Sequence, residues 1–299
     1  MSGKIKPLKN DIPFIIINYT IFGIFTLMCI IPFYYLFINT ISDNDLVKRG
    51  LIRLIPRGFH LSNYEQVIKL RGLSQAAFIS VSRTLLGTVL TVLASGFVGY
   101  LFTKQIMWGR KFWYRFIIIT MYFSAGLVPW YMNMVMLRLT NNFLAYIIPG
   151  IMAPFSIILV KTYIESIPPS LEESASIDGA GTITIFHKII LPLTKPILAT
   201  IAIFGAVGHW NSFIDTLFLM TEERMFTLQF VLWRYLNEAN YLASIMRSGT
   251  AAAVDVSQAL TPRTIQMTIS MIVVFPILLA YPFLQRFFVK GIMVGAIKG

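Results

Sequence analysis

Long apolar runs, separated by shorter polar stretches, dominate this chain. A helix needs about 20 predominantly apolar residues to cross the hydrocarbon core of a bilayer. The apolar residues fill these runs rather than following one amphipathic stripe. The pattern predicts an all-α, polytopic membrane protein, with residues 1–299 as a single transmembrane domain. Its six transmembrane helices are expected at about 13–38, 77–102, 112–137, 143–164, 196–220 and 265–288.

Residues 165–196, between the fourth and fifth expected spans, carry a polar pattern instead. Ser170 and Glu173 have the spacing of a capping box, in which a hydroxyl and a carboxylate satisfy free N–H groups at a helix start. Pro168 and Pro169 lie just upstream, where proline suits the beginning of a helix. The pattern predicts a short helix that begins with this capping box.

A second short helix is expected after a glycine hinge. Gly179 and Gly181 allow the positive φ that ends a helix and redirects the chain. Apolar residues then recur at helical spacing until Pro192 stops the pattern, at Ile183, Phe186 and Ile190. A polar pair of helices in a chain that is otherwise mostly apolar indicates a surface presented to a partner in water.

This loop resembles the EAA loop of the inner-membrane permease subunits of bacterial ABC importers. Glu173-Ser174-Ala175 stands where the family has Glu-Ala-Ala, with serine in place of the middle alanine. In that family the loop docks in a cleft of the ATPase subunit. The resemblance therefore implies a coupling role for Glu172, Glu173, Ser174, Ala175, Asp178, Gly179, Ala180, Leu191 and Pro192.

Composition agrees with a membrane chain, since 56% of the 299 residues are hydrophobic, only 13% are charged and the mean hydropathy is +0.71. The net charge of +12 comes from short basic clusters beside the apolar runs rather than from a basic domain. Such clusters are typical of topology signals and not of nucleic-acid binding. They occur in the N-terminal tail, between the second and third spans and in the C-terminal tail.

Those three clusters fall on one side if six spans alternate, and this side is expected to be cytoplasmic. Both termini and the 165–196 loop would then lie in the cytoplasm, with the chain in the bacterial inner membrane. The expected external loop at 39–76 is also basic, but basic residues in long loops count less toward the orientation than those in short ones. A second long external loop is expected at about 221–264. The N-terminal apolar run is longer than a signal-peptide core and is expected to be an uncleaved span.

Motifs for catalysis by the chain itself are absent from the sequence. There is no phosphate-binding loop, no nucleophile elbow, no zinc-protease motif and no paired cysteines. The three histidines are far apart, and the single Cys29 offers no metal cluster. We expect a transport subunit without a metal or cofactor, whose partner ATPase subunits bind ATP and Mg²⁺.

Ionisable groups inside the expected spans are costly and usually face the interior of a helix bundle. Arg83 lies in the second span, and His209, Asn211 and Asp215 lie in the fifth. Asn211 and Asp215 are four residues apart, so a continuous helix would place them on one face. We expect an inward-facing polar strip and an ion pair between Arg83 and Asp215. The alternative is a structural interhelical hydrogen bond without a role in transport.

Aromatic residues complete the expected substrate path. Trp210-Asn211-x-Phe213 and the stretch 122–131 resemble parts of carbohydrate-type permeases, and aromatic faces suit the C–H faces of sugar rings. Pro129 is expected to kink the third span. The candidate path consists of Tyr122, Trp130, Tyr131, His209, Trp210, Asn211 and Asp215. The C-terminal residues 281–299 resemble the ending of permeases that import oligosaccharides and polysaccharide fragments. In some relatives this tail reaches the ATPase, which implies the same for Lys298 and Gly299.

The resemblance implies a complete transporter around this chain. A second permease would form a heterodimer with it, two ATPase subunits would bind on the cytoplasmic side, and an extracytoplasmic solute-binding protein would deliver an oligosaccharide. Two other classes remain open at this point. An ion-gradient-driven secondary transporter of a small polar solute would need intramembrane carboxylates such as Asp215. A membrane-embedded enzyme would need a catalytic constellation that the sequence lacks.

Overall fold

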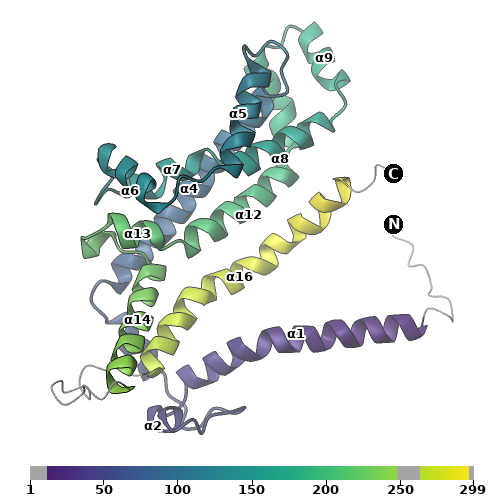
Figure 1. The fold of residues 1–299 in the computed structure, drawn as a ribbon. Helices are drawn as coiled ribbons and strands as arrows, with labels where there is room; N and C mark the ends of the chain where they lie inside the picture. Colours follow the sequence, from purple (N-terminus) through teal and green to yellow (C-terminus); the bar gives the residue numbers. More distant parts are fainter. Residues whose placement is uncertain (1–11, 248–262, 296–299) are drawn as a thin grey trace. The chain divides into compact units, whose positions relative to one another are not determined.

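The computed structural model describes the backbone of residues 12–247 and 263–295, and the side chains of residues 12–238 and 263–280. Every regular element in these ranges is a helix (Figure 1). The chain forms two compact units, one of residues 1–70 with 239–272 and one of residues 71–238 with 273–299. The N-terminal lysine cluster, Lys298 and Gly299 lie outside the described residues.

The first unit contains α1 (Ile12–Thr40), a single helix that continues through Pro32. Two short helices follow inside the expected external loop, α2 (Asn44–Lys48) and α3 (Ser62–Ile68). The carboxylate of Asp43 starts α2 by accepting from the N–H groups of Asp45 and Leu46 at 3.0 and 3.1 Å. Buried Ile38, Val47 and Ile52 form the small core of this unit.

The second unit is built around α4 (Leu73–Leu101), α8 (Pro154–Glu165) and α12 (Lys195–Asn211), which pack side by side (Figure 1). Small residues on α4 allow this close packing. A Cβ atom added at Gly99 would lie 2.9 Å from the Cβ of Val160. One added at Gly96 would lie 3.4 Å from Leu198.

The expected third span is two helices, α5 (Arg110–Tyr122) and α6 (Leu127–Met136). Residues 123–126 between them are not helical, and Gly126 has a φ of +86°. The expected kink at Pro129 is therefore wrong. The interruption comes earlier, because proline is accommodated in the first turn of α6, where its missing N–H costs nothing.

The fourth and fifth expected spans are also interrupted. η2 (Phe143–Tyr146) and α7 (Ile148–Ile151) meet α8 at an angle of 41°. Helix α12 ends at Asn211, Ser212 is extended, and α13 (Ile214–Leu219) begins two residues later. Asn211 and Asp215 therefore do not share a helix face, and the four-residue spacing argument fails.

The expected external loop at 221–264 contains regular structure in its described part. η4 (Glu223–Met225) is followed by α14 (Leu228–Arg247), whose first turns bury Leu228, Phe230 and Val231. Residues 248–262 lie outside the described ranges. The last described helix is α16 (Arg263–Gly295).

Three described helices are long and apolar enough to cross a membrane, namely α1, α4 and the Arg263–Ala280 part of α16. The number rises to five if each bent pair counts as one span, since Thr182–Leu193 meets Lys195–Asn211 at 78°. The expected all-helical, membrane-spanning class is confirmed. The breaks just described explain why the count of six does not follow from helix length alone.

Candidate functional site

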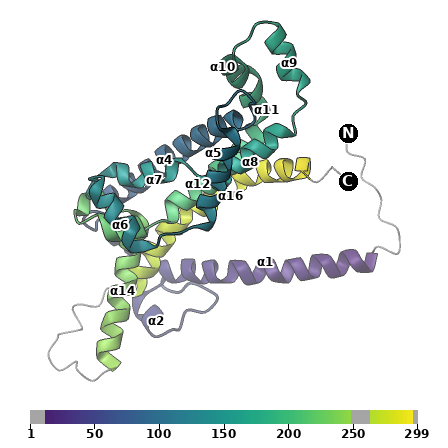
Figure 2. The same ribbon diagram turned by 45° about the horizontal axis from the view of Figure 1, so that its top comes forward.

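The 165–196 loop folds as two short helices that lie beyond the end of the α4–α8–α12 group (Figure 2). The first is α9 (Ser170–Ile177). Its expected capping box is not formed, because the helix starts one residue earlier. Pro169 is already helical, with φ −64° and ψ −24°, and its carbonyl accepts from the N–H groups of Glu172 and Glu173 at 3.0 and 3.1 Å. The Ser170 hydroxyl makes no cap bond.

The glycine hinge is present at one of the two expected positions. Gly179 has a φ of +81°, which favours glycine, and the following Ala180 donates its N–H to the carbonyl of Ala175 at 2.9 Å. Gly181 is extended, with φ −71° and ψ 160°, so the expected positive φ is wrong there.

The second helix of the loop runs through α10 (Thr182–Ile185), the π-helical turn η3 (Phe186–Ile190) and α11 (Leu191–Leu193). Of the three apolar residues at helical spacing, Phe186 and Ile190 are buried, whereas Ile183 is 67% exposed. Pro192 lies within this helix, which continues for one more residue and ends at Leu193. The sharp bend follows Leu193 instead.

Helix α9 has two different faces. Glu172 and Ala175 are half-buried, and Ala175 packs against the core cluster that includes Ile164. Glu173 and Ile177, four residues apart on the other side, are exposed, and 86% of Ile177 is accessible. Ser174, Asp178 and Gly179 are also exposed. The two neighbouring glutamates therefore point in different directions.

Glu172 forms an ion pair with Lys104, which lies just after the end of α4. The Lys104 ammonium also lies 4.3 Å from the centre of the Tyr100 ring. Burial lowers the pKa of Lys104 from its ordinary value. The hydroxyl of Tyr100 donates to the carbonyl of Thr182 at 3.3 Å. One end of α4 thus contacts both short helices of the loop.

A second candidate site is a cavity of about 360 Å³ inside the larger unit. Its walls come from α4, α6, η2, α7, α8, α12 and α13. The residues that line it are Arg83, Thr91, Trp130, Ala145, Tyr146, Pro149, Gly150, Ala153, Ser156, Phe204, Gly205, Gly208, His209, Ser212 and Asp215.

Arg83 and Asp215 meet at this cavity as an ion pair with two contacts. Nη2 lies 2.5 Å from Oδ2, and Nη1 lies 3.1 Å from Oδ1. The Arg83 side chain is 2% exposed and that of Asp215 15%. Nη1 also donates to the carbonyl of Ser212 at 3.2 Å, in the break between α12 and α13. The cation thus stabilises both the carboxylate and an interrupted backbone.

Tyr146 joins this ion pair to the helices around it. The Arg83 guanidinium lies 4.4 Å from the centre of the Tyr146 ring. The Tyr146 hydroxyl donates to the carbonyl of Met225 at 2.6 Å and lies 3.1 Å from the hydroxyl oxygen of Thr216. Side chains from α4, η2 and α13 are therefore held in one network.

His209 lies in a slot made by two glycines. A Cβ atom added at Gly87 would lie 2.5 Å from the imidazole, and one at Gly150 would lie 3.3 Å from it. Among the described residues no hydrogen bond to this imidazole is found. His209 therefore presents an imidazole to the cavity, whereas the guanidinium of Arg83 is already paired.

The structure brings only some of the expected path residues to this cavity. Trp130, His209 and Asp215 line it. Tyr122 is 85% exposed at the end of α5, and neither Tyr131 nor Asn211 belongs to the lining. The sequence analysis assigned all of these polar and aromatic residues to one path, because the sequence does not show where the helices break.

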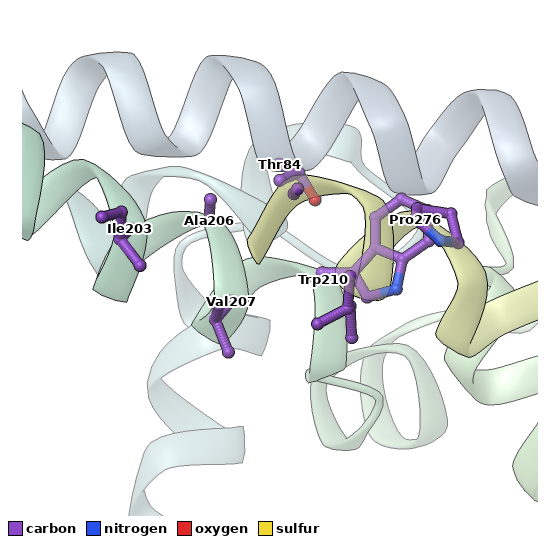
Figure 3. Close-up of a pocket in the computed structure, with 8 residues that line it drawn as sticks. Thr84, Ile203, Ala206, Val207, Trp210 and Pro276 are labelled. Carbon is purple, nitrogen blue, oxygen red and sulfur yellow. The ribbon is translucent and has the colours of Figure 1, made fainter. Parts of the chain in front are cut away.

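Trp210 faces a different hollow. Its indole N–H donates to the carbonyl of Val273 at 3.0 Å, and its ring lines an apolar pocket of about 180 Å³ (Figure 3). Thr84, Ile203, Ala206, Val207, Pro276, Ile277 and Ala280 complete that pocket. Trp210 thus connects α12 to α16 and does not enter the polar cavity.

Sequence reasoning missed two residues that organise these sites, Tyr146 and Lys104. For Tyr146 a signal was present, because Pro149-Gly150 soon afterwards interrupts an apolar run and marks irregular backbone. Lys104 belongs to the basic cluster between the second and third expected spans, which was interpreted only as a topology signal. Its pairing with Glu172 depends on tertiary packing.

Comparisons with known proteins establish the family. No protein-family model matches the chain. The chain is 30% identical over 292 residues to the polygalacturonan/rhamnogalacturonan transport system permease protein YtcP of Bacillus subtilis, covering 98% of this chain and 100% of that protein. The chain belongs to the carbohydrate-type permease subunits of bacterial ABC importers. The resemblance recognised in the 165–196 loop is thereby confirmed.

Further relatives of this permease agree. It is 33% identical over 273 residues to protein LplC of Bacillus subtilis, covering 90% of each chain. It is 29% identical over 283 residues to the arabinooligosaccharides transport system permease protein AraQ of Halalkalibacterium halodurans, covering 93% of this chain and 94% of that protein. AraQ, like YtcP, is by its name a transport system permease protein.

A solved structure supports the same assignment. The permease matches a chain in the crystal structure of a bacterial ABC transporter involved in the import of the acidic polysaccharide alginate, with a TM-score of 0.81 and 28% identity. The match covers 95% of this permease and 100% of that chain. These comparisons favour an ABC importer over the ion-gradient-driven alternative.

Proposed function

We propose that this permease forms, with a second permease, the path by which an oligosaccharide or polysaccharide fragment enters the cell. An extracytoplasmic solute-binding protein delivers the sugar. Two separate ATPase subunits bind ATP and Mg²⁺, and this chain holds neither. The observation that carries the proposal is the match to a sugar-transport permease over 98% of the chain.

In the proposed topology the chain crosses the bacterial inner membrane six times as one transmembrane domain, with both termini in the cytoplasm. The third expected span would be the broken pair α5 and α6. A break in a membrane-spanning helix leaves backbone groups free, and the surrounding protein must satisfy them. At the break between α12 and α13, Arg83 does this by donating to the carbonyl of Ser212. The 165–196 loop would lie on the cytoplasmic side, where the ATPase subunits bind.

The exposed face of α9 is the proposed ATPase contact. Glu173 offers a carboxylate to basic groups of a partner, and Ile177 offers an apolar side chain that is 86% exposed. Gly179 sets the angle between the two short helices. Leu191 and Pro192 lie in the helix that leads back to α12. ATP-driven closure of the ATPase dimer would displace this loop and, with it, the helices that it contacts.

The polar cavity is the proposed part of the substrate path in this chain. Trp130 and Phe204 offer aromatic surfaces for sugar rings, and His209 offers an imidazole for a hydroxyl or carboxylate. Asp215 is paired with Arg83 of the same chain, so its carboxylate already has a cation as its partner at the cavity wall.

The proposal is tested with the complex purified through a tag on this chain and placed in lipid vesicles with its binding protein. We expect an ATPase subunit and a second permease to co-purify. Uptake of labelled fragments should need ATP and should survive an ionophore that collapses ion gradients. The probes are oligogalacturonides, rhamnogalacturonan fragments, arabino-oligosaccharides and maltodextrins.

Two variants connect the uptake to the loop. Glu173→Lys reverses the exposed charge, and Gly179→Pro removes the positive φ. Both should lose the ATPase subunit or its stimulation by the loaded binding protein. Uptake that continues without ATP, or a complex that contains no ATPase, would overturn the proposed function.

A further inference from the structure

The two neighbouring glutamates of α9 have different surroundings, although the family motif places both in the coupling loop. Glu173 is exposed, whereas the Glu172 side chain is only 23% exposed and forms the ion pair with Lys104. The Lys104 side chain is 18% exposed. A carboxylate already held by a cation of its own chain is a poor candidate for contact with another subunit.

The ion pair is one of several contacts that fasten the loop to α4. The Lys104 ammonium lies over the Tyr100 ring at 4.3 Å, and Tyr100 donates to the carbonyl of Thr182 at 3.3 Å. The centre of the Tyr100 ring lies 5.2 Å from that of Phe186. Tyr100 is fully buried and Phe186 is 7% exposed, so these contacts are shielded from water.

The same helix reaches the polar cavity. Arg83 and Thr91 of α4 line it, and Gly87 lies against the imidazole of His209. Leu101, the last residue of α4, follows Arg83 by 18 positions, which corresponds to about 27 Å along a helix. The 29 residues of α4 form one uninterrupted helix. A single helix therefore connects the loop to the cavity wall.

We propose that Lys104 and Glu172 form a latch that makes α9 and the end of α4 move as one lever. Glu172 is then a positioning residue that transmits the motion, and Glu173 is the contact with the ATPase. This inference rests on the proposed function. It gives the two neighbouring glutamates different roles, since Glu173 binds the partner and Glu172 passes the partner's movement to α4.

The test separates docking from transmission in the purified complex with its binding protein. Docking is read from the amount of ATPase subunit retained by the tagged chain. Transmission is read from a cysteine in the cavity wall, Gly208→Cys, in a Cys29→Ser background, because a Cβ atom at Gly208 meets nothing within 4 Å. Its alkylation rate by a maleimide is compared with and without Mg-ATP and vanadate.

For Lys104→Glu and for Glu172→Lys we expect normal retention of the ATPase subunit. The ATP-dependent change in alkylation should fall about tenfold in each. The double exchange Lys104→Glu with Glu172→Lys should restore most of the change, and Lys104→Arg should retain it. Glu173→Lys should instead lose the ATPase subunit, and Lys104→Glu should not rescue it.

A neighbouring ion pair supplies the matched control. Lys161 and Glu165 of α8 lie 2.7 Å apart and have no contact with α9 among the described interactions. Lys161 lies before the 165–196 loop, and Lys161→Glu should leave both readouts unchanged. If Glu172→Lys loses the ATPase subunit as Glu173→Lys does, Glu172 is a docking residue and the latch is overturned. The latch is also overturned if Lys104→Glu keeps the full ATP-dependent change.

Two further checks keep the outcomes distinct. If a charge reversal prevents folding, the neutral variants Lys104→Gln and Glu172→Gln take its place, and the latch predicts the same loss of transmission. If the unmutated chain retains no ATPase subunit, the proposed function fails. If the unmutated chain retains an ATPase subunit and responds to ATP, the results for the variants test only the latch.

Discussion

Helices α1 and α4 have the same length, 29 residues, and both are apolar enough to cross a membrane. They differ in what surrounds them. None of the most apolar stretch of α1 is buried, whereas 33% of that of α4 is. Ile21, Phe25 and Met28 of α1 are all more than half exposed. The buried face of α4 instead carries small and polar residues, among them Arg83, Gly96 and Gly99.

The difference shows that the residues that let a helix cross a membrane are not those that make it pack against other helices. Lipid tails are as apolar as leucine, so an apolar surface alone gives a helix no preference for its own chain. Small residues permit close approach, and a buried charge requires a partner. Helix α4 has both features on its buried face, whereas α1 carries no charged residue and a Cβ atom at its Gly23 would meet nothing within 4 Å. The surface of α1 is suited to lipid or to a second subunit.

The largest effect is expected at the buried charge of α4. Arg83→Met should destabilise the permease by about 3–5 kcal/mol, because the Asp215 carboxylate then stays buried without its cation. Thermal unfolding of the chain in detergent measures this. The double variant Arg83→Met with Asp215→Asn should recover most of the loss. Equal stability of the single and double variants would show that the ion pair does not hold this region.

A leucine in place of a packed glycine should have the next largest effect. In Gly99→Leu the new side chain meets Val160 at 2.9 Å and the carbonyl of Ile157 at 3.2 Å. We expect a loss of about 1–3 kcal/mol or more, from overpacking against α8. The matched control is Gly23→Leu in α1, where a Cβ atom meets nothing within 4 Å. The same unfolding assay should show no loss for it, and equal losses would contradict the comparison.

Gly87→Ala should have a smaller effect, because the atom it meets belongs to a side chain that can turn. The added Cβ atom would lie 2.5 Å from the His209 imidazole. Forcing the imidazole from its rotamer costs about 0.5–1.5 kcal/mol. Combining Gly87→Ala with His209→Ala should remove this cost, and a double-mutant cycle measures the coupling. Strictly additive effects would mean that the glycine does not make room for His209.

The smallest effect is expected on the exposed surface of α1. Leu27 is 61% exposed, so Leu27→Ala should change the stability of the isolated chain by less than about 0.5 kcal/mol. Unfolding of the chain alone in detergent measures this. The same variant is then measured in the assembled complex. A loss only in the complex would place α1 against a second subunit, whereas a large loss in the isolated chain would contradict its exposure.

Much of the fold could be predicted because apolar run length and glycine chemistry are local. The two regular spans α1 and α4 begin and end within a few residues of the expected boundaries. Gly179 has the expected positive φ, since few other residues adopt it without strain. The family resemblance of Glu173-Ser174-Ala175 also depends only on the order of residues, and the comparisons confirm the family.

The breaks could not be predicted, because an apolar run looks the same whether its helix is continuous or interrupted. Ser212 and Phe213 interrupt the fifth expected span, and this places Asp215 on a new helix. The cost of that break is offset by Arg83, 129 positions before Ser212, whose guanidinium reaches its carbonyl. A stabilising contact between such distant positions leaves no local signal.

The sequence by itself indicated a membrane permease, and it predicted that one loop faces a partner and that Arg83 has a buried anion beside it. These follow from composition, motif order and the high cost of an isolated charge. Only the tertiary structure decided which residues share the polar cavity, and that Trp210 lies in a separate pocket. It also decided that Glu172 turns inward to Lys104 while Glu173 faces out. Adjacent side chains on a helix point about 100° apart, so their partners depend on which helices pack beside them.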